Sequence, residues 1–187
     1  LLAPMPPSHQ QLLFAAEILF LDIASDASSN ILVRHFSSTE EVVLQHAPAL
    51  CPHPYTSRVI GMNAVRSYFD LLATHWLRSE TKLHSRRVVE GTSKVTVNAS
   101  VKWTWRLSGR SWREDFLCTL EYDDNLKVAQ MIIETNSPQG TCVMRAIDAD
   151  PLASGELPMS PAVSNQPSLK VQFSPTLLGF SDRGARD

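Results

Sequence analysis

The sequence predicts an α+β fold in which N-terminal helices pack on one face of a curved, mostly antiparallel sheet. Two observations support this prediction. Helical periodicity dominates the chain before residue 77, and alternating strand patterns dominate it from residue 83 to residue 134. Helices followed by a run of hairpin-connected strands are typical of a sheet that is covered on one face only.

A long hairpin between residues 94 and 122 is the clearest local pattern. Apolar and polar residues alternate on both sides of the turn at Ser108-Gly109-Arg110. Such sustained period-two alternation indicates half-buried strands. The side chains predicted on the buried face are Val95, Val97, Ala99, Val101, Trp103, Trp105, Leu107, Trp112, Glu114, Phe116, Cys118, Leu120 and Tyr122. The face is therefore rich in tryptophan, and Glu114 is its one carboxylate.

The first helix is predicted from a capping box, in which Ser8 and Gln11 are three residues apart. Apolar side chains then recur on one side of this helix as far as Ile23. A short second helix is expected over residues 31–36, and a strand over residues 41–46.

The third helix begins after Gly61. Its apolar positions follow helical spacing, and they are Val65, Tyr68, Phe69, Leu72 and Trp76. Strands over residues 83–90 and 126–134 flank the hairpin and complete the predicted sheet.

Composition indicates one domain with additional length. The chain has 187 residues, of which 43% are hydrophobic, which is enough for one domain core. We place the domain at residues 8–136. Residues 137–187 are rich in proline and serine and are expected to form a flexible tail. Apolar residues at 169–173 and 177–180 suggest an alternative, in which part of the tail docks on the sheet or on a partner.

Charge and cysteine content exclude several classes of protein. The net charge of -2 gives no general attraction to nucleic acid or to anionic lipid. The apolar run over residues 12–23 is interrupted by Glu17 and Asp22, and it is shorter than the roughly 20 residues of a membrane span. Three widely spaced cysteines do not form a disulfide framework and suit a reducing compartment. We therefore expect a cytoplasmic protein with neither nucleic acid nor membrane as a partner.

Three segments resemble the nuclear transport factor 2-like superfamily, in particular its SnoaL-like branch. They are Glu40-Glu41-Val42-Val43-Leu44-Gln45-His46, the join from Val59 to Phe69 that contains Gly61-Met62-Asn63-Ala64-Val65-Arg66, and Asp123-Asp124-Asn125-Leu126-Lys127-Val128. The resemblance covers residues 11–136 and implies a cone-shaped domain with a pocket open at one end. Members include isomerases, dehydratases, polyketide cyclases and non-catalytic binding or dimerising domains, so the fold alone does not settle function.

The resemblance also implies a position for a catalytic base. Ketosteroid-isomerase-like members carry an aspartate just before a proline at the end of the first strand, and His46 is the nearest counterpart in Gln45-His46-Ala47-Pro48. A histidine suits proton transfer because its ordinary pKa is about 6.5. The alternative is a structural or exposed histidine.

Other family positions depart from the ketosteroid isomerase pattern. No tyrosine occurs at residues 17–19, where the oxyanion-stabilising phenol is expected, and Cys118 stands where the partner acid is expected. Without these donors the chemistry loses its main electrostatic stabilisation. A looser likeness to scytalone-dehydratase-like sites involves His46, His75, Tyr55 and Tyr68.

Glu114 is the carboxylate of greatest interest. If the hairpin register holds, it shares a side with Trp112 and Phe116, where desolvation would raise its pKa and make it a proton donor. The alternative is a solvated carboxylate at the rim, or one paired with Arg106. Candidate catalytic residues are therefore His46, Glu114 and Tyr55. Candidate ligand-binding residues, each with core or edge packing as the alternative, are Trp103, Trp105, Phe116, Cys118, His75 and Tyr122.

No metal or cofactor is expected. His46, Cys51 and His53 lack the paired spacing of a zinc site, which needs three or four converging ligands. The sequence has neither a glycine-rich phosphate loop nor a serine nucleophile motif.

Two functional hypotheses remain. The first is a cofactor-independent lyase or isomerase that acts on a hydrophobic small molecule, with His46 moving the proton. The second is a non-catalytic module of the same fold that forms a homodimer or binds another protein. Its contact surface would be the C-terminal tail or the outer sheet face, on which Thr96, Asn98, Ser100, Lys102 and Thr104 are predicted.

Overall fold

The computed structural model describes residues 6–148. The helices and 3₁₀ turns are α1 (His9–Ala24), α2 (Ser29–Leu32), η1 (Val33–His35), η2 (Pro54–Ser57), α3 (Met62–His75) and η3 (Val143–Arg145). The strands are β1 (Val43–Pro48), β2 (Arg58–Ile60), β3 (Trp76–Val88), β4 (Lys94–Trp105), β5 (Ser111–Tyr122) and β6 (Val128–Thr135).

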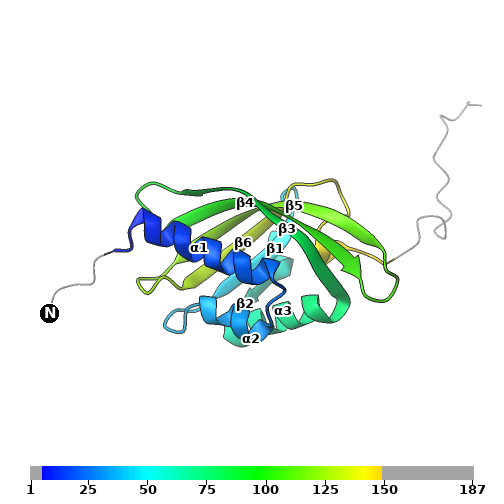
Figure 1. Ribbon diagram of the computed structural model, residues 1–187, viewed down its shortest axis with the longest axis horizontal. Helices are drawn as coiled ribbons and strands as arrows, with labels where there is room; N and C mark the ends of the chain where they lie inside the picture. Colours follow the sequence, from blue (N-terminus) through cyan, green and yellow to red (C-terminus); the bar gives the residue numbers. More distant parts are fainter. Residues whose placement is uncertain (1–5, 149–187) are drawn as a thin grey trace, which may run out of the picture. The chain divides into compact units, whose positions relative to one another are not determined.

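The six strands form one sheet in the order β2-β1-β6-β5-β4-β3. Only the β1–β6 pair is parallel; the other four pairs are antiparallel. The sheet is curved, and Figure 1 shows α1, α2 and α3 on the same side of it. The predicted α+β fold, with N-terminal helices on a curved and mostly antiparallel sheet, is confirmed.

The register of the hairpin places the predicted face against the helices. Val101 lies opposite Glu114 and Trp103 lies opposite Trp112. From Val95 to Trp103 every second side chain of β4 is buried, as are those of β5 from Glu114 to Tyr122. Leu107 is an exception, because β4 ends at Trp105 and Leu107 lies in the turn with 94% of its surface exposed.

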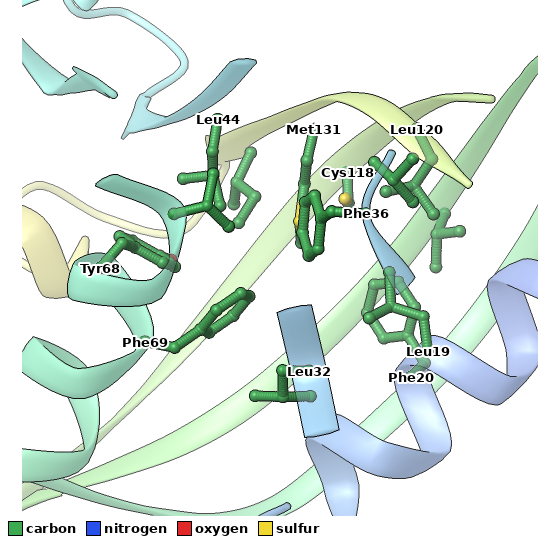
Figure 2. Close-up of a cluster of buried hydrophobic side chains, with 14 of the residues drawn as sticks. Leu19, Phe20, Leu32, Phe36, Leu44, Tyr68, Phe69, Cys118, Leu120 and Met131 are labelled. Carbon is green, nitrogen blue, oxygen red and sulfur yellow. The ribbon is translucent and has the colours of Figure 1, made fainter. Parts of the chain in front are cut away.

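Helices α1 and α3 supply the other half of the core. The predicted capping box at Ser8 and Gln11 is present at the start of α1. Figure 2 shows Leu19 and Phe20 on α1, and Tyr68 and Phe69 on α3, among buried side chains in front of the sheet. Burial of these large apolar side chains is the main driving force for packing the helices on the sheet.

Strand β3 begins seven residues earlier than the sequence pattern indicates. Trp76, assigned above to the third helix, is the first residue of β3 and has extended backbone angles. Trp76 is nevertheless buried, as predicted. It lies where α3 passes into β3, and both elements pack on the core at this junction. The three-residue strand β2 was not predicted, since so short a segment shows no measurable period.

Residues beyond Asn136 also pack on the sheet. Cys142 and Val143 are buried, and Trp112 Nε1 donates a hydrogen bond of 2.7 Å to the carbonyl of Thr141. The rest of the predicted tail, including the apolar residues at 169–180, lies outside the described residues. Among residues 6–148, no helix has the length and hydropathy needed to cross a membrane.

Candidate functional site

Three polar side chains from different elements meet in the interior. His46 Nε2 lies 2.9 Å from Glu114 Oε1, and His46 Nδ1 lies 2.8 Å from the Tyr68 hydroxyl oxygen. His46 and Glu114 are 2% and 0% exposed, and Tyr68 is 6% exposed. A carboxylate, an imidazole and a phenol therefore form one buried chain of hydrogen bonds.

The fold brings these residues together through contacts that are distant in sequence. His46 lies on β1, which pairs with the end of β6, and β6 in turn pairs with β5, which carries Glu114. Tyr68 lies on the buried stripe of α3, beside Val65, Phe69 and Leu72. Its ring packs edge-on against Phe69, with centroids 5.2 Å apart, which fixes the position of the phenol.

Glu114 accepts four hydrogen bonds. His46 Nε2 and Thr135 Oγ1 approach Oε1 at 2.9 and 2.5 Å, while Trp103 Nε1 and the Val143 amide approach Oε2 at 2.6 and 3.3 Å. Four donors fill the acceptor sites of a carboxylate. Glu114 is therefore held as an anion, and the sequence-based alternatives of a solvated rim residue or a partner of Arg106 are wrong.

The pKa shifts also describe a charged pair. Burial by itself raises the pKa of Glu114, but the charge of His46 and the hydrogen bonds of His46, Thr135 and Trp103 leave it lower than usual. We expected burial to raise this pKa; the donors reverse the sign. Burial by itself lowers the pKa of His46, but Tyr68, Glu114 and a hydrogen bond with Cys142 raise it well above its usual value of 6.5. The direction of this shift favours the imidazolium form of His46.

An imidazolium at His46 determines how Tyr68 is oriented. In the imidazolium form both ring nitrogens are donors, so Nδ1 donates to the Tyr68 oxygen and leaves the phenolic hydrogen free. Among residues 6–148, His46 is the only hydrogen-bond partner of the Tyr68 hydroxyl. Burial raises the pKa of Tyr68, which keeps the phenol neutral and able to donate.

A small cavity adjoins this chain of hydrogen bonds. Its volume is about 40 Å³, and His46, Tyr68 and Trp103 contribute to its wall together with α1 and β3. Apolar side chains line most of the remainder, namely Phe20, Ile23, Phe69, Leu72, Val101, Phe116, Met131 and Ile133. This space holds roughly three water molecules, whereas pockets for drug-sized ligands measure roughly 300–1,000 Å³.

Only some of the candidate residues from the sequence meet at the cavity. His46, Trp103 and Phe116 line it, and Glu114 lies directly behind His46. Tyr55 is 70% exposed on η2, and His75 is exposed at the end of α3. Trp105 packs between Trp76 and Trp112 instead.

Two further candidates, Cys118 and Tyr122, are buried in the core outside the cavity wall. Burial raises the pKa of the Cys118 thiol, and this keeps the thiol protonated. The hydroxyl of Tyr122 has no hydrogen-bond partner among the described residues.

Sequence reasoning missed Thr135, Cys142 and Val143 as parts of this site. Thr135 ends the last strand, and the other two lie in the segment assigned to the tail, so no local pattern marked them. Tyr68 appeared only as a loose candidate, since its helical spacing is equally that of a core residue.

The described residues contain one group with potential metal-ligand spacing. Ligand atoms of His46, Glu114 and Cys142 lie within 4.8 Å of one another. However, the four hydrogen bonds to Glu114 occupy its oxygens, so the donor set fits an ion pair better than a metal ion. Neither Cys51 nor His53, the sequence-based alternatives, belongs to this group.

Comparison with protein families and with curated protein sequences finds no match. Solved structures match the fold. They include the epoxide hydrolase/cyclase-like enzyme SalBIII, which is 14% identical with a TM-score of 0.57, covering 68% of this chain and 92% of the other. The pinacolase BvnE of Penicillium brevicompactum is 14% identical, with a TM-score of 0.53 and coverage of 68% and 86%.

A computationally designed 17-OHP binder also matches, at 11% identity with a TM-score of 0.54 and coverage of 67% and 94%. At such low identity these similarities show the fold alone. The chain therefore has the cone-shaped, nuclear transport factor 2-like fold class that the sequence predicts.

Proposed function

We propose that this protein is a cofactor-independent lyase or isomerase that moves a proton on a small hydrophobic molecule. The observation that carries the proposal is the buried chain of hydrogen bonds from Glu114 through His46 to Tyr68, at the wall of an apolar cavity. A reacting hydroxyl next to a histidine, which a carboxylate orients in turn, is a recurrent arrangement for proton transfer. SalBIII and BvnE, both described as enzymes, support this choice within the fold.

In this proposal Tyr68 is the group that meets the substrate. Its free phenolic proton passes to a carbonyl, hydroxyl or epoxide oxygen, while the Nδ1 proton of His46 passes to the Tyr68 oxygen. In the second step the Tyr68 oxygen takes a proton from a substrate carbon. At the same time the hydroxyl proton of Tyr68 passes to His46 Nδ1 and restores the imidazolium. Glu114 stays ionised throughout and is a positioning residue, because it orients His46 and balances its charge.

Deuterium exchange tests this proposal. The probe is 2-indanone, a ketone with one aromatic ring and mobile protons next to its carbonyl, followed by proton NMR in D₂O. We expect the wild-type protein to accelerate exchange and Tyr68→Phe to lose roughly 100-fold of that acceleration, which is the lower range of general acid–base catalysis.

Tyr122→Phe is the matched control, because it removes a buried phenolic oxygen that has no partner. It should exchange 2-indanone as fast as the wild type. Equal rates for Tyr68→Phe and the wild type, or no acceleration by the wild type, would refute the proposal.

The non-catalytic module of the same fold is the alternative. Its homodimer or protein contact would use the outer sheet face, on which Asn98 is exposed and Thr96, Lys102 and Thr104 are half-buried. Ser100, also predicted on this face, is buried under His84 and Arg113. That alternative predicts no exchange in any variant, together with loss of assembly, measured by light scattering, when this face is changed.

A further inference from the structure

One surface groove shares part of its wall with the inner cavity. A groove of about 250 Å³ lies between α1 and β3, lined by Glu17, Leu21, Ala24, Leu83 and Arg86 together with Phe20 and Thr81. Phe20 and Thr81 also line the inner cavity. These two side chains therefore form a shared wall between the cavity beside His46 and Tyr68 and the surface groove.

On the β3 side, where Thr81 lies, the shared wall is locally irregular. The pairing of β3 with β4 shifts register between Ser79 and Lys82, so Glu80 and Thr81 lie in a bulge without ladder partners. Glu80 has a positive φ of 49°, and the Thr81 hydroxyl is buried without a hydrogen-bond partner among the described residues. Bulges of this kind bend a strand and interrupt its ladder.

On the α1 side, the side chain common to both spaces is the ring of Phe20. Phe20 is 4% exposed and stacks on Phe116, with ring centroids 6.5 Å apart. Figure 2 shows Phe20 on α1 facing the interior, with Tyr68 and Phe69 on α3 beyond it. Rotation of this one side chain would join the inner cavity to the outer groove.

Two ion pairs link β3 to α1 and to the turn that follows it, one on either side of this point. Arg78 Nη2 lies 2.9 Å from Asp26 Oδ1, and Arg86 Nη2 lies 2.9 Å from Glu17 Oε2. The ring of Phe20 lies between these two ion pairs along the chain. Glu17 and Arg86 line the outer groove, whereas Tyr68 lines the inner cavity.

We propose that Phe20 is the gate and the size-determining residue of the site, and that the ligand enters between α1 and the β3 bulge. Joined, the two spaces approach roughly 300 Å³, the lower limit for pockets that bind small organic molecules. The ligand is accordingly a hydrophobic molecule of one or two rings with one acceptor oxygen at its inner end. The identity of that inner contact rests on the proposed function; the gate itself does not.

Binding of two probes tests the gate. Indane and 2-indanone have the same ring system, but only 2-indanone carries an acceptor oxygen. Titrations are followed by NMR at the indole N–H of Trp103, which lines the cavity. We expect Phe20→Leu to raise the association rate of both probes by roughly tenfold, since a lowered barrier acts exponentially on a rate. Phe20→Trp should abolish binding of both.

Phe14 supplies the matched control, because it lies on the same helix, 63% exposed and outside the cavity wall. Phe14→Leu and Phe14→Trp should bind both probes as the wild type does. Wild-type binding by Phe20→Trp would overturn the gate, even if Tyr68→Phe abolishes exchange. Conversely, an effect of Phe20 on both probes without any exchange of 2-indanone would retain the gate and reject the proposed function.

Discussion

At the scale of single residues, the site is a buried ion pair with a phenol attached. Removing one partner of such a pair leaves an uncompensated charge and costs about 3–5 kcal/mol. A variant such as His46→Ala therefore cannot separate a catalytic role from a structural one. Tyr68→Phe and Glu114→Gln are more informative, because each preserves shape.

The pH dependence of stability has a defined sign for this pair. The raised pKa of His46 gives stability that is fully present below its unfolded value of about 6.5 and is lost as pH rises through the folded pKa. The lowered pKa of Glu114 gives stability that is present above about 4.3 and is lost as pH falls through the folded pKa. The contribution of the pair is therefore largest between about pH 4.5 and 6.5.

Glu114→Gln should reduce the loss of stability as pH rises above about 6.5. Without the charge and the hydrogen bond of Glu114, the pKa of His46 falls toward its unfolded value, so less stability depends on its proton. Urea unfolding at pH 5.5 and 7.5 measures this difference. Glu121→Gln, on the same strand but at the surface, should keep the wild-type slope. An unchanged slope in Glu114→Gln would mean that the pair carries no charge.

At the scale of elements, the segment after β6 completes the site. Val143 is 1% exposed, and its amide donates to Glu114. Arg145 donates a hydrogen bond of 2.9 Å to Thr56, and Ser108 donates one of 2.7 Å to Asp148. Residues 137–148 thus close the end of the sheet over His46 and Glu114.

Val143→Ala should lower the free energy of unfolding by about 2 kcal/mol, through lost apolar burial and the cavity that remains. Ile147→Ala is the control in the same segment, because Ile147 is 77% exposed. It should change stability by less than about 0.5 kcal/mol. Chemical denaturation provides both values. Equal effects of the two substitutions would show that this segment does not belong to the folded core.

At the scale of the whole molecule, local patterns were predictable and distant pairings were not. The alternation over residues 112–122 placed Glu114 on the inner face, because side-chain direction in a strand follows from local sequence. The parallel pairing of β1 with β6, which positions His46, depends on which distant strands meet. No period in the sequence encodes that choice.

The same limit explains the site residues that were misplaced or missed. Tyr55 and His75 were attractive as residue types, yet both are exposed. Val143 bonds Glu114 across 29 positions, through a segment whose composition suggests a tail. The charge state of Glu114 was also mispredicted from local sequence, because its pKa depends on hydrogen-bond donors from three other parts of the chain.

The protonation state of His46 tests the central claim most directly. Nitrogen-15 NMR of the His46 side chain, recorded from pH 5 to pH 9, reports whether each ring nitrogen carries a proton. The hydrogen-bonded chain of Glu114, His46 and Tyr68 predicts two protonated nitrogens at pH 7, with a pKa well above 6.5. A neutral imidazole at pH 7, with one nitrogen unprotonated, would contradict the ion pair and the proton route built on it.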